Sequence, residues 1–243
     1  NDDQNSGEYE LTGQEGTLVA EGASSQQNAM DYFASVYASE VPGAQLAYTP
    51  SGSGAGQKNF IANQAVFAGS DSPLKDDQIQ AAADRCGGNE AWHLPFVIGP
   101  VAIAYNLDGV EDLNLTVDNL VDIFKGDITT WNDPAIAALN PGVTLPSAKI
   151  TVVHRSDGSG TTFNFVNYLS KVSPEWKSSV GEGTSVQWPA GIGGKGNEGV
   201  AAYVKQIKGA IGYVEKSFAD QNKLQAAAID NGSGAVELST DSA

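Results

Sequence analysis

The chain has 243 residues, which is enough for two domains or one large domain with an ample core. Its formal net charge of −16 would repel nucleic acid and anionic membrane surfaces, so neither is expected as a partner. The same charge makes long-range attraction of a small anion unfavourable, so local dipoles and hydrogen bonds would have to hold one. Apolar residues make up 41% of the chain and charged residues 17%, a composition typical of globular proteins.

The sequence offers no set of residues suited to holding a metal or a cofactor. Cys86 is the single cysteine, which excludes an internal disulfide, a zinc cluster and a C-x-x-C redox pair. His93 and His154 have no cysteine or acidic residue at ligand spacing. Neither a metal nor a cofactor is therefore predicted. No apolar run approaches the length of a membrane-spanning helix.

The N-terminal third of the chain repeats one pattern. Residues 1–16 are polar, acidic and interrupted by glycine, and they predict a disordered leader. Three units then follow, each with a short apolar strand, a turn of small polar residues and a helix. The strands are expected at residues 17–20, 45–49 and 66–68. This alternation predicts an α/β fold with a parallel sheet and with ligand loops at the carboxyl ends of its strands.

Residues 92–105 form the most apolar stretch of the chain, interrupted by Pro95, Gly99 and Pro100. We interpret this stretch as one strand entering a domain boundary and a second strand leaving it. The four tryptophans are scattered, and each is expected in the core. Further along, the pattern predicts helices over 116–124, 131–139 and 198–205, a glycine-rich segment over 181–199, a strand over 210–214, a helix from Lys216 and a polar tail over 230–243.

Residues 150–169 carry the clearest functional signal. An apolar strand ends at His154, a turn follows, and a helix begins near Thr161 with Ser159 or Thr161 as its N-cap. Such a junction gathers free backbone N–H groups at the positive end of the helix dipole, where an anion is stabilised. Arg155 adds a cation with a bidentate fork, and Ser159, Thr161 and Thr162 add hydroxyl donors. The alternative is an ordinary strand-to-helix turn without a ligand.

Two other motifs are weaker. Residues 191–196 satisfy G-x-G-x-x-G, but they follow no convincing strand, which argues against a dinucleotide site. Ser159 with His154 would form the nucleophile and base of a phosphatase-like hydrolase, but no Asp is placed to orient His154. The hydrolase remains an alternative function, as does an acidic surface protein without a role in transport.

Several loops occur in the order found in one family. They are Gly52–Gly56, Gly69–Leu74, Trp131–Pro134 and Arg155–Thr161, supported by Gly191–Gly199 and Gly209–Tyr213. This arrangement resembles the substrate-binding protein of bacterial ABC-type phosphate importers, from about Thr17 to about Leu224. The resemblance implies a two-lobed periplasmic-binding-protein-like α/β fold that closes on one phosphate. Residues 17–99 would form the N-terminal part of lobe I and residues 100–243 would form lobe II.

The resemblance also implies a set of phosphate ligands. Asp71 would accept a hydrogen bond from the proton of phosphate, unless it merely caps the helix that follows. The first loop reads Gly-Ala-Ser-Ser-Gln-Gln where the family usually has Gly-Ala-Thr-Phe-Pro. Ser24 therefore keeps a hydroxyl, whereas the aromatic position is lost at Ser25, from which only the backbone N–H is expected to contribute. Asp157 would brace the cation Arg155. The implied phosphate-binding residues are Ser24, Ser25, Ser53, Asp71, Arg155, Ser159, Gly160 and Thr161.

The implied function is high-affinity capture of inorganic phosphate outside the membrane by a monomeric, non-enzymatic receptor that delivers it to an ABC-type permease. A periplasmic or extracellular location is expected, with a lipid anchor through an N-terminal cysteine outside this sequence. In the family the chain continues and returns to complete lobe I. The resemblance therefore implies an incomplete lobe I here, with a lost disulfide partner as one explanation of the single Cys86.

Overall fold

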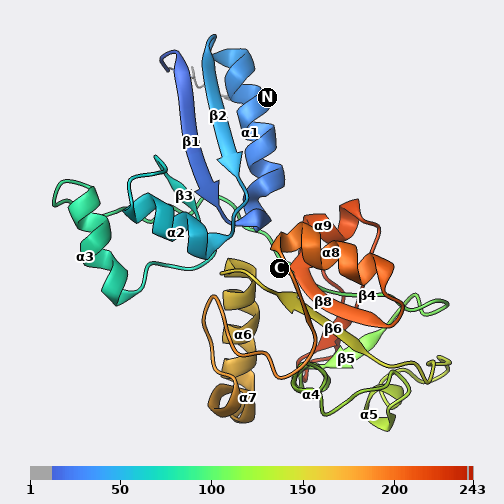
Figure 1. The fold of residues 1–243 in the computed structure, drawn as a ribbon. Coiled ribbons are helices and arrows are strands. Elements are labelled where there is room, and N and C mark those ends of the chain that lie inside the picture. Colours follow the sequence, from blue (N-terminus) through green and yellow to red (C-terminus); the bar gives the residue numbers. More distant parts are fainter. Residues whose placement is uncertain (1–12, 240, 243) are drawn as a thin grey trace, which may run out of the picture.

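The computed structural model describes residues 13–239, 241 and 242, so most of the predicted leader lies outside the described residues. The chain forms two lobes joined by the segment 86–100, which contains no helix or strand (Figure 1). Lobe I extends from β1 to α3, and lobe II extends from β4 to β11. The predicted two-lobed α/β fold class is confirmed, and within the described part of the chain no helix is long and apolar enough to cross a membrane.

Lobe I is built from the three predicted strand–turn–helix units. Its parallel strands lie in the order β2-β1-β3, with Glu21 of β1 opposite Thr49 and Gly22 opposite Gly69. The carboxyl ends of all three strands therefore meet at one edge, as predicted. The elements of this lobe are β1 (Gly16–Gly22), the 3₁₀ turn η1 (Ser24–Gln26), α1 (Gln27–Glu40), β2 (Ala44–Thr49), α2 (Ser53–Ile61), β3 (Ala68–Gly69) and α3 (Asp76–Arg85).

Lobe I buries few large side chains. Met30 is buried on α1, whereas Val19 of β1 is 51% exposed. The predicted strand at the start of residues 92–105 is wrong, because residues 91–100 pair with no strand and only β4 follows. Trp92 is 84% exposed and Ile98 is 94% exposed, so the prediction that every tryptophan lies in the core is also wrong. The extended segment 91–100 thus presents its apolar side chains to solvent.

Lobe II is organised around a five-stranded sheet in the order β7-β6-β8-β4-β9. This sheet is mixed rather than parallel, because β4 runs antiparallel to β8 and β9 while β6 runs parallel to β7 and β8. A second sheet has the order β11-β10-β5. The strands are β4 (Val101–Tyr105), β5 (Asn114–Thr116), β6 (Thr151–Arg155), β7 (Ile192–Gly194), β8 (Ala210–Glu215), β9 (Gln225–Ala226), β10 (Ala228–Asp230) and β11 (Ala235–Val236).

Four helices of lobe II lie close to the predicted positions, whereas one predicted helix is shorter and α7 was not predicted. The predicted helix over 131–139 is reduced to α5 (Pro134–Ala137), because Trp131 is buried in the core, where its Nε1–H donates to the Gly209 carbonyl at 2.9 Å. Asp133 caps α5 and Pro134 occupies its first position. The remaining helices are α4 (Val117–Lys125), α6 (Gly160–Val172), α7 (Pro174–Ser179), α8 (Gly196–Gln206) and α9 (Lys216–Gln221).

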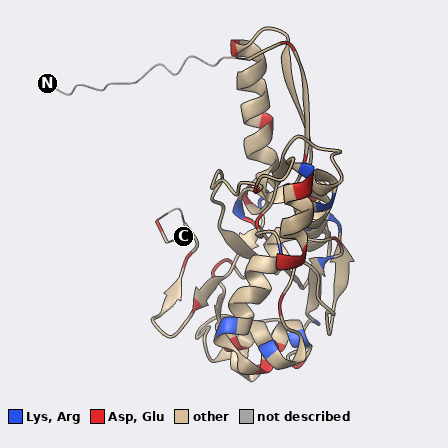
Figure 2. Ribbon diagram, turned by 90° about the vertical axis from the view of Figure 1, so that its left-hand side faces the viewer, with Lys and Arg blue, Asp and Glu red and all other residues tan. Residues whose placement is uncertain are grey.

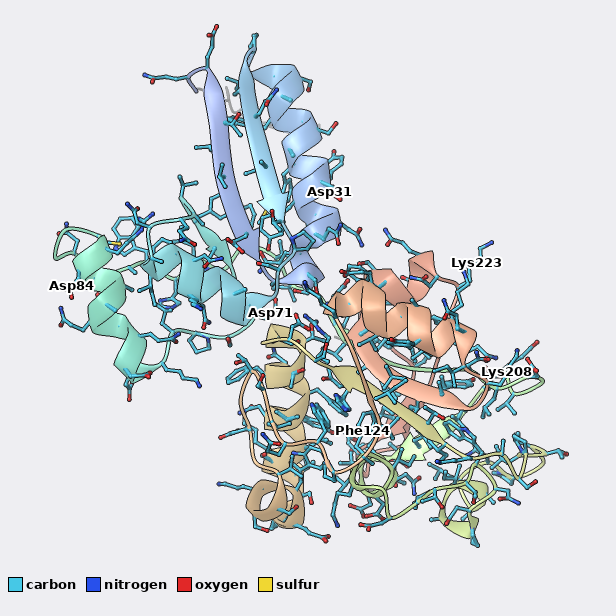
Figure 3. The ribbon with its side chains drawn as sticks, viewed as in Figure 1. Asp31, Asp71, Asp84, Phe124, Lys208 and Lys223 are labelled. Atoms are coloured by element: carbon cyan, nitrogen blue, oxygen red, sulfur yellow. The ribbon has the colours of Figure 1, made fainter. Side chains whose placement is uncertain are left out.

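The five-stranded sheet is covered on both faces. Phe124 of α4 lies in one layer, with its ring centroid 4.9 Å from that of Phe165 on α6 and 6.2 Å from that of Tyr213 on β8 (Figure 3). A second cluster brings Val153 of β6 against Val200 of α8. These two layers bury most of the large apolar side chains described, and they fix the ends of β6 and β8 at which the polar loops begin.

Candidate functional site

The polar loops of the two lobes meet at one place. The Gly54 N–H of lobe I donates to the Gly158 carbonyl of lobe II at 3.0 Å. Asn164 of α6 donates through Nδ2 to the Asp71 carbonyl at 2.9 Å, and Asp71 lies at the junction of the lobes (Figure 3). The loops after β1, β2 and β3 therefore face the first residues of α6 and α8. Seven of the eight residues predicted to bind phosphate lie in these loops or at the helix starts, whereas Arg155 is the last residue of β6 and Asp157 lies in the loop that follows it.

Arg155 is the cation of this region. It is the last residue of β6, and its side chain is almost fully buried. Its Nε and Nη2 donate to the two carboxylate oxygens of Asp157 at 2.7 and 2.6 Å, a bidentate pair. Burial alone would raise the pKa of Asp157, but the hydrogen bonds and charge of Arg155, with the Gly196 N–H, hold that pKa below its usual range. The pair fixes the guanidinium and leaves its other N–H groups free to donate.

Four buried hydroxyls belong to the predicted ligand set, and each accepts a hydrogen bond from an N–H group. Ser159 Oγ accepts from Thr162 N at 2.9 Å as the N-cap of α6, and Ser53 Oγ accepts from Asp71 N at 3.1 Å. Ser24 Oγ accepts from Asn197 N at 3.0 Å, and Thr161 Oγ1 accepts from Asn197 Nδ2 at 3.2 Å. Among the described residues none of the four hydroxyl hydrogens has a protein acceptor. The four hydroxyls can therefore donate to a ligand.

Asp71 is the acceptor in this set of donors. Ser25 Oγ donates to both of its carboxylate oxygens, at 2.8 and 2.7 Å. Burial raises the pKa of Asp71, and the hydrogen bonds from Ser25 and Gln26 and the charge of Arg155 oppose that rise. The alternative that Asp71 caps the next helix is wrong, because α3 begins at Asp76 with Lys75 as its N-cap. Only the backbone N–H of Ser25 was expected to contribute to the site. Its side chain instead orients the Asp71 carboxylate.

Glycine is required where the two lobes approach most closely. A Cβ at Gly160 would overlap Ser53 Oγ and the Asp71 side chain, and a Cβ at Gly54 would lie 3.1 Å from Gly158 Cα. Gly52 has φ +101°, in the left-handed region, and a Cβ there would lie 2.6 Å from Asp157 Oδ2. The glycine-rich loops therefore allow a contact distance that no other residue type permits.

Some polar residues have positions that the sequence did not predict. Thr162, expected as a free donor, instead shares a hydrogen bond of 2.6 Å with the Tyr213 hydroxyl, which also accepts from Arg155 N at 2.9 Å. Burial raises the pKa of Tyr213, so this hydroxyl keeps its proton. Asn197 lies inside the glycine-rich segment, where no motif distinguishes it. Its contacts with Ser24 and Thr161 nevertheless place it beside the site.

Neither alternative motif has the geometry it needs. The His154 ring stacks on Trp188 with centroids 4.9 Å apart, and its Nδ1 lies 3.0 Å from the Arg155 carbonyl. Burial lowers the pKa of His154, and no hydrogen bond joins it to Ser159 Oγ. In the segment 191–196, strand β7 occupies 192–194, so these glycines are not a turn after a strand. Neither a Ser–His pair nor a dinucleotide turn is formed.

Comparison with known proteins agrees with this geometry. A family model described as a PBP superfamily domain matches residues 7–243. The chain belongs to this superfamily. It is 53% identical over 194 residues to the phosphate-binding protein PstS of Xylella fastidiosa, covering 79% of this chain and 51% of that protein. It is 47% identical over 228 residues to PstS of Pasteurella multocida, covering 93% of this chain and 64% of that protein.

A solved structure has the same fold. The phosphate-binding protein from Stenotrophomonas maltophilia superposes with a TM-score of 0.66 at 25% identity, covering 93% of this chain and 68% of that chain. The chain spans 51% and 64% of the length of the two PstS relatives. Two α/β lobes with their polar loops facing each other are the arrangement of this superfamily. The choice of ligand depends on the residues of those loops.

Proposed function

We propose that this chain binds inorganic phosphate between its lobes as the receptor of an ABC-type importer. The observation that carries the proposal is the set of four buried hydroxyl donors and Arg155 at the junction of the lobes, with the Asp71 carboxylate as an acceptor beside them. Donors of this kind stabilise an anion, and they do so without water competing for them. The relatives named phosphate-binding protein PstS support phosphate as that anion.

The proposed ligands are those implied by the sequence. Arg155, with Asp157 holding its fork, would bind phosphate oxygens from lobe II, along with Ser159, Thr161 and the N–H groups at Gly160. Ser24, Ser53 and the backbone of Ser25 would donate from lobe I. Binding groups on both lobes make closure depend on the ligand, because each lobe alone holds only part of the donor set.

Asp71 favours phosphate over sulfate. A carboxylate facing an anion in a site with little water is unfavourable unless the anion supplies a proton between them. Phosphate near neutral pH carries a proton and sulfate does not. A site that demands one hydrogen bond can reject an analogue that lacks it by about 10⁴–10⁵. We therefore expect strong preference for phosphate, and Asp71→Asn would narrow it because an amide can donate to sulfate.

The function proposed is binding rather than catalysis. A phosphatase using Ser159 would need a base beside its hydroxyl, and His154 points to the Arg155 carbonyl instead. Receptor function places the protein outside the membrane, in the periplasm or at the extracellular face, where a permease receives phosphate from it. The fold supports a monomer that acts by opening and closing its lobes.

Titration calorimetry with inorganic phosphate tests the proposal, with sulfate competition and a phosphatase assay on the same preparation. We expect binding, weak competition by sulfate and no turnover. Arg155→Ala should weaken binding at least about tenfold, because charge-assisted hydrogen bonds contribute about 1.5–3 kcal/mol each. The matched control is Arg85→Ala, since Arg85 is tied to the Phe60 and Ala65 carbonyls within lobe I. Turnover, or equal binding by Arg155→Ala, would contradict the proposal.

A further inference from the structure

Asn197 is the fully buried polar residue that connects the two lobes at the site. It lies in the first turn of α8, in lobe II, and its exposed fraction is 0%. Its backbone N–H donates to Ser24 Oγ of lobe I at 3.0 Å, and its Nδ2 donates to the same oxygen at 2.9 Å. Nδ2 also lies 3.2 Å from Thr161 Oγ1 of lobe II. One side chain therefore contacts a hydroxyl from each lobe.

The orientation of this amide is fixed by its other end. Asn197 Oδ1 accepts a hydrogen bond from the backbone N–H of Glu215, at the end of β8, at 2.8 Å. A backbone N–H can only donate, so the atom facing it must be the amide oxygen. Nδ2, which can only donate, then faces Ser24 and Thr161. A sheet N–H of lobe II thus determines which end of the Asn197 amide points toward the site.

This orientation determines the direction of two hydroxyl groups. Ser24 Oγ accepts from both N–H groups of Asn197, which occupies its two lone pairs and turns its hydrogen away. Thr161 Oγ1 accepts from Nδ2 and likewise keeps its hydrogen for another acceptor. Among the described residues no protein acceptor takes either hydrogen. Both hydroxyls are therefore held as donors before a ligand arrives.

We propose that Asn197 is a positioning residue that orients the Ser24 and Thr161 hydroxyls toward the anion and joins lobe I to lobe II when the site closes. The inference rests on the proposed phosphate binding and adds a residue that does not itself contact the anion. Because its bonds to Ser24 exist only when the lobes are together, Asn197 slows phosphate release more than it speeds phosphate capture.

Asn197→Asp tests this role with almost no change of shape. The new carboxylate keeps the bond from Glu215 N but accepts from Ser24 and Thr161 where the amide donated, so both hydroxyl hydrogens turn away from phosphate. We expect phosphate affinity to fall at least 100-fold, mainly through faster dissociation in stopped-flow measurements. Asn197→Ala should lower phosphate affinity less than Asn197→Asp does, by about tenfold, because the backbone N–H still donates to Ser24.

Asn140 provides the matched control. It is also buried, and its side chain makes three hydrogen bonds, to Asn114 N, the Asn114 carbonyl and the Ile136 carbonyl, all within lobe II. Asn140→Asp and Asn140→Ala should lower the melting temperature and change phosphate affinity less than twofold. A second check is the Ser24→Ala background, in which Asn197→Ala should have a smaller effect, since one hydroxyl that it orients is gone.

The outcomes separate this inference from the proposed function. If the wild-type protein does not bind phosphate, the proposed function fails, and this inference fails with it. If wild type binds but the Asn197 and Asn140 variants lose affinity equally, or Asn197→Ala has the same effect with and without Ser24, only the role of Asn197 is overturned. If both Asn197 variants fail to fold while the Asn140 variants fold, Asn197 is a structural residue of lobe II and the inference is overturned.

Discussion

Asp71, the proposed specificity residue, also has a cost to stability. Burial raises the pKa of its carboxyl, against the opposing hydrogen bonds of Ser25 and Gln26 and the charge of Arg155. The folded protein therefore binds the Asp71 proton more tightly than the unfolded chain does. The stability that this group contributes is fully present below the unfolded pKa of about 3.9 and is lost as the pH rises through the folded value. At neutral pH the phosphate-free protein contains an unfavourable buried carboxylate.

Asp71→Asn should therefore raise the melting temperature of the phosphate-free protein at pH 7. The difference from wild type should shrink as the pH falls and disappear only below the unfolded pKa of about 3.9, because the wild-type carboxyl is then protonated in both states. Scanning calorimetry of both proteins across this pH range measures the difference in melting temperature. Asp31→Asn is the control, since Asp31 is an exposed carboxylate on α1 (Figure 3). Equal melting temperatures for Asp71→Asn and wild type at pH 7 would contradict the argument.

At the residue scale, sequence predicted the charged partners better than the neutral ones. The contact of Arg155 with Asp157 follows from one short turn, and loop motifs identified Asp71 and Ser53. Thr162 and Asn197 could not be interpreted correctly, because the direction of a hydroxyl or amide depends on partners far away in the chain. The Thr162 hydroxyl is hydrogen-bonded to Tyr213 on β8, and Glu215 N orients the Asn197 amide. Whether these residues bind phosphate stays a prediction.

At the element scale, the starts of helices do most of the positioning. α2 begins at Ser53, α6 at Gly160 and α8 at Gly196, and all three starts lie at the junction of the lobes. The strand–turn–helix pattern predicted the starts of α6 and α8 within two residues because small residues and N-caps are local signals, whereas α2 begins inside the loop Gly52–Gly56, earlier than predicted. The strand predicted near Trp92 failed for a nonlocal reason. An apolar run becomes a strand only when another strand pairs with it, and none does among the described residues.

Ser159 serves as a helix cap and as a proposed ligand, and a matched substitution separates the two roles. Ser159→Ala and Thr116→Ala each remove an N-cap hydroxyl that accepts from the third helical N–H, at 2.9 and 3.0 Å. Each should lower the free energy of unfolding by about 1 kcal/mol. Only Ser159→Ala should also weaken phosphate binding, because Thr116 caps α4 away from the site. Denaturant melts and calorimetry measure both effects, and equal affinities for the two variants would exclude Ser159 as a ligand.

Gly160→Ala separates closure from folding. Gly160 is the first residue of α6, its φ is not in the left-handed region, and alanine favours a helix more than glycine does. Lobe II should therefore melt no lower than in wild type. The new Cβ would overlap Ser53 Oγ and Asp71 across the lobes, so phosphate affinity should fall at least 100-fold. Small-angle scattering should show the variant staying more extended in saturating phosphate, and wild-type compaction by the variant would refute the steric argument.

At the scale of the whole molecule, acidic residues outnumber basic ones by 29 to 13. Figure 2 shows α1 with acidic residues and no basic ones, in keeping with Asp31 and Glu40 in its sequence. With a net charge of −16, the protein would have to hold an anion through the short-range donors at the junction. Bonds to backbone groups and buried hydroxyls are screened little by salt, so phosphate affinity should depend weakly on ionic strength.

The two lobes also differ in how much apolar surface they bury. Every residue of β8 in lobe II is buried, as are the aromatic side chains of Phe124 and Phe165. In lobe I the strand β1 leaves Leu18 and Val19 about half exposed, at 43% and 51%. The buried apolar residues of lobe I are alanines, apart from Met30 and Val41. Burial of apolar area is the main source of stability, so lobe I of this chain should open locally more often than lobe II.

Hydrogen exchange measures that difference directly. Without phosphate, amides of β1 and β2 should exchange at least tenfold faster than those of β6 and β8. Saturating phosphate binds both lobes, so opening of lobe I then requires release of the ligand. Stabilisation by a ligand at about a hundredfold excess over Kd is about 2.7 kcal/mol, which is about a hundredfold slowing. That slowing should be confined to lobe I and to the loops at the junction.

Arg155→Ala is the control, because lobe I of that variant should show little slowing at the same phosphate concentration. Equal exchange in the two lobes without phosphate would show that the exposed β1 side chains do not limit stability, and protection of lobe II alone would mean that the ligand does not bridge the lobes.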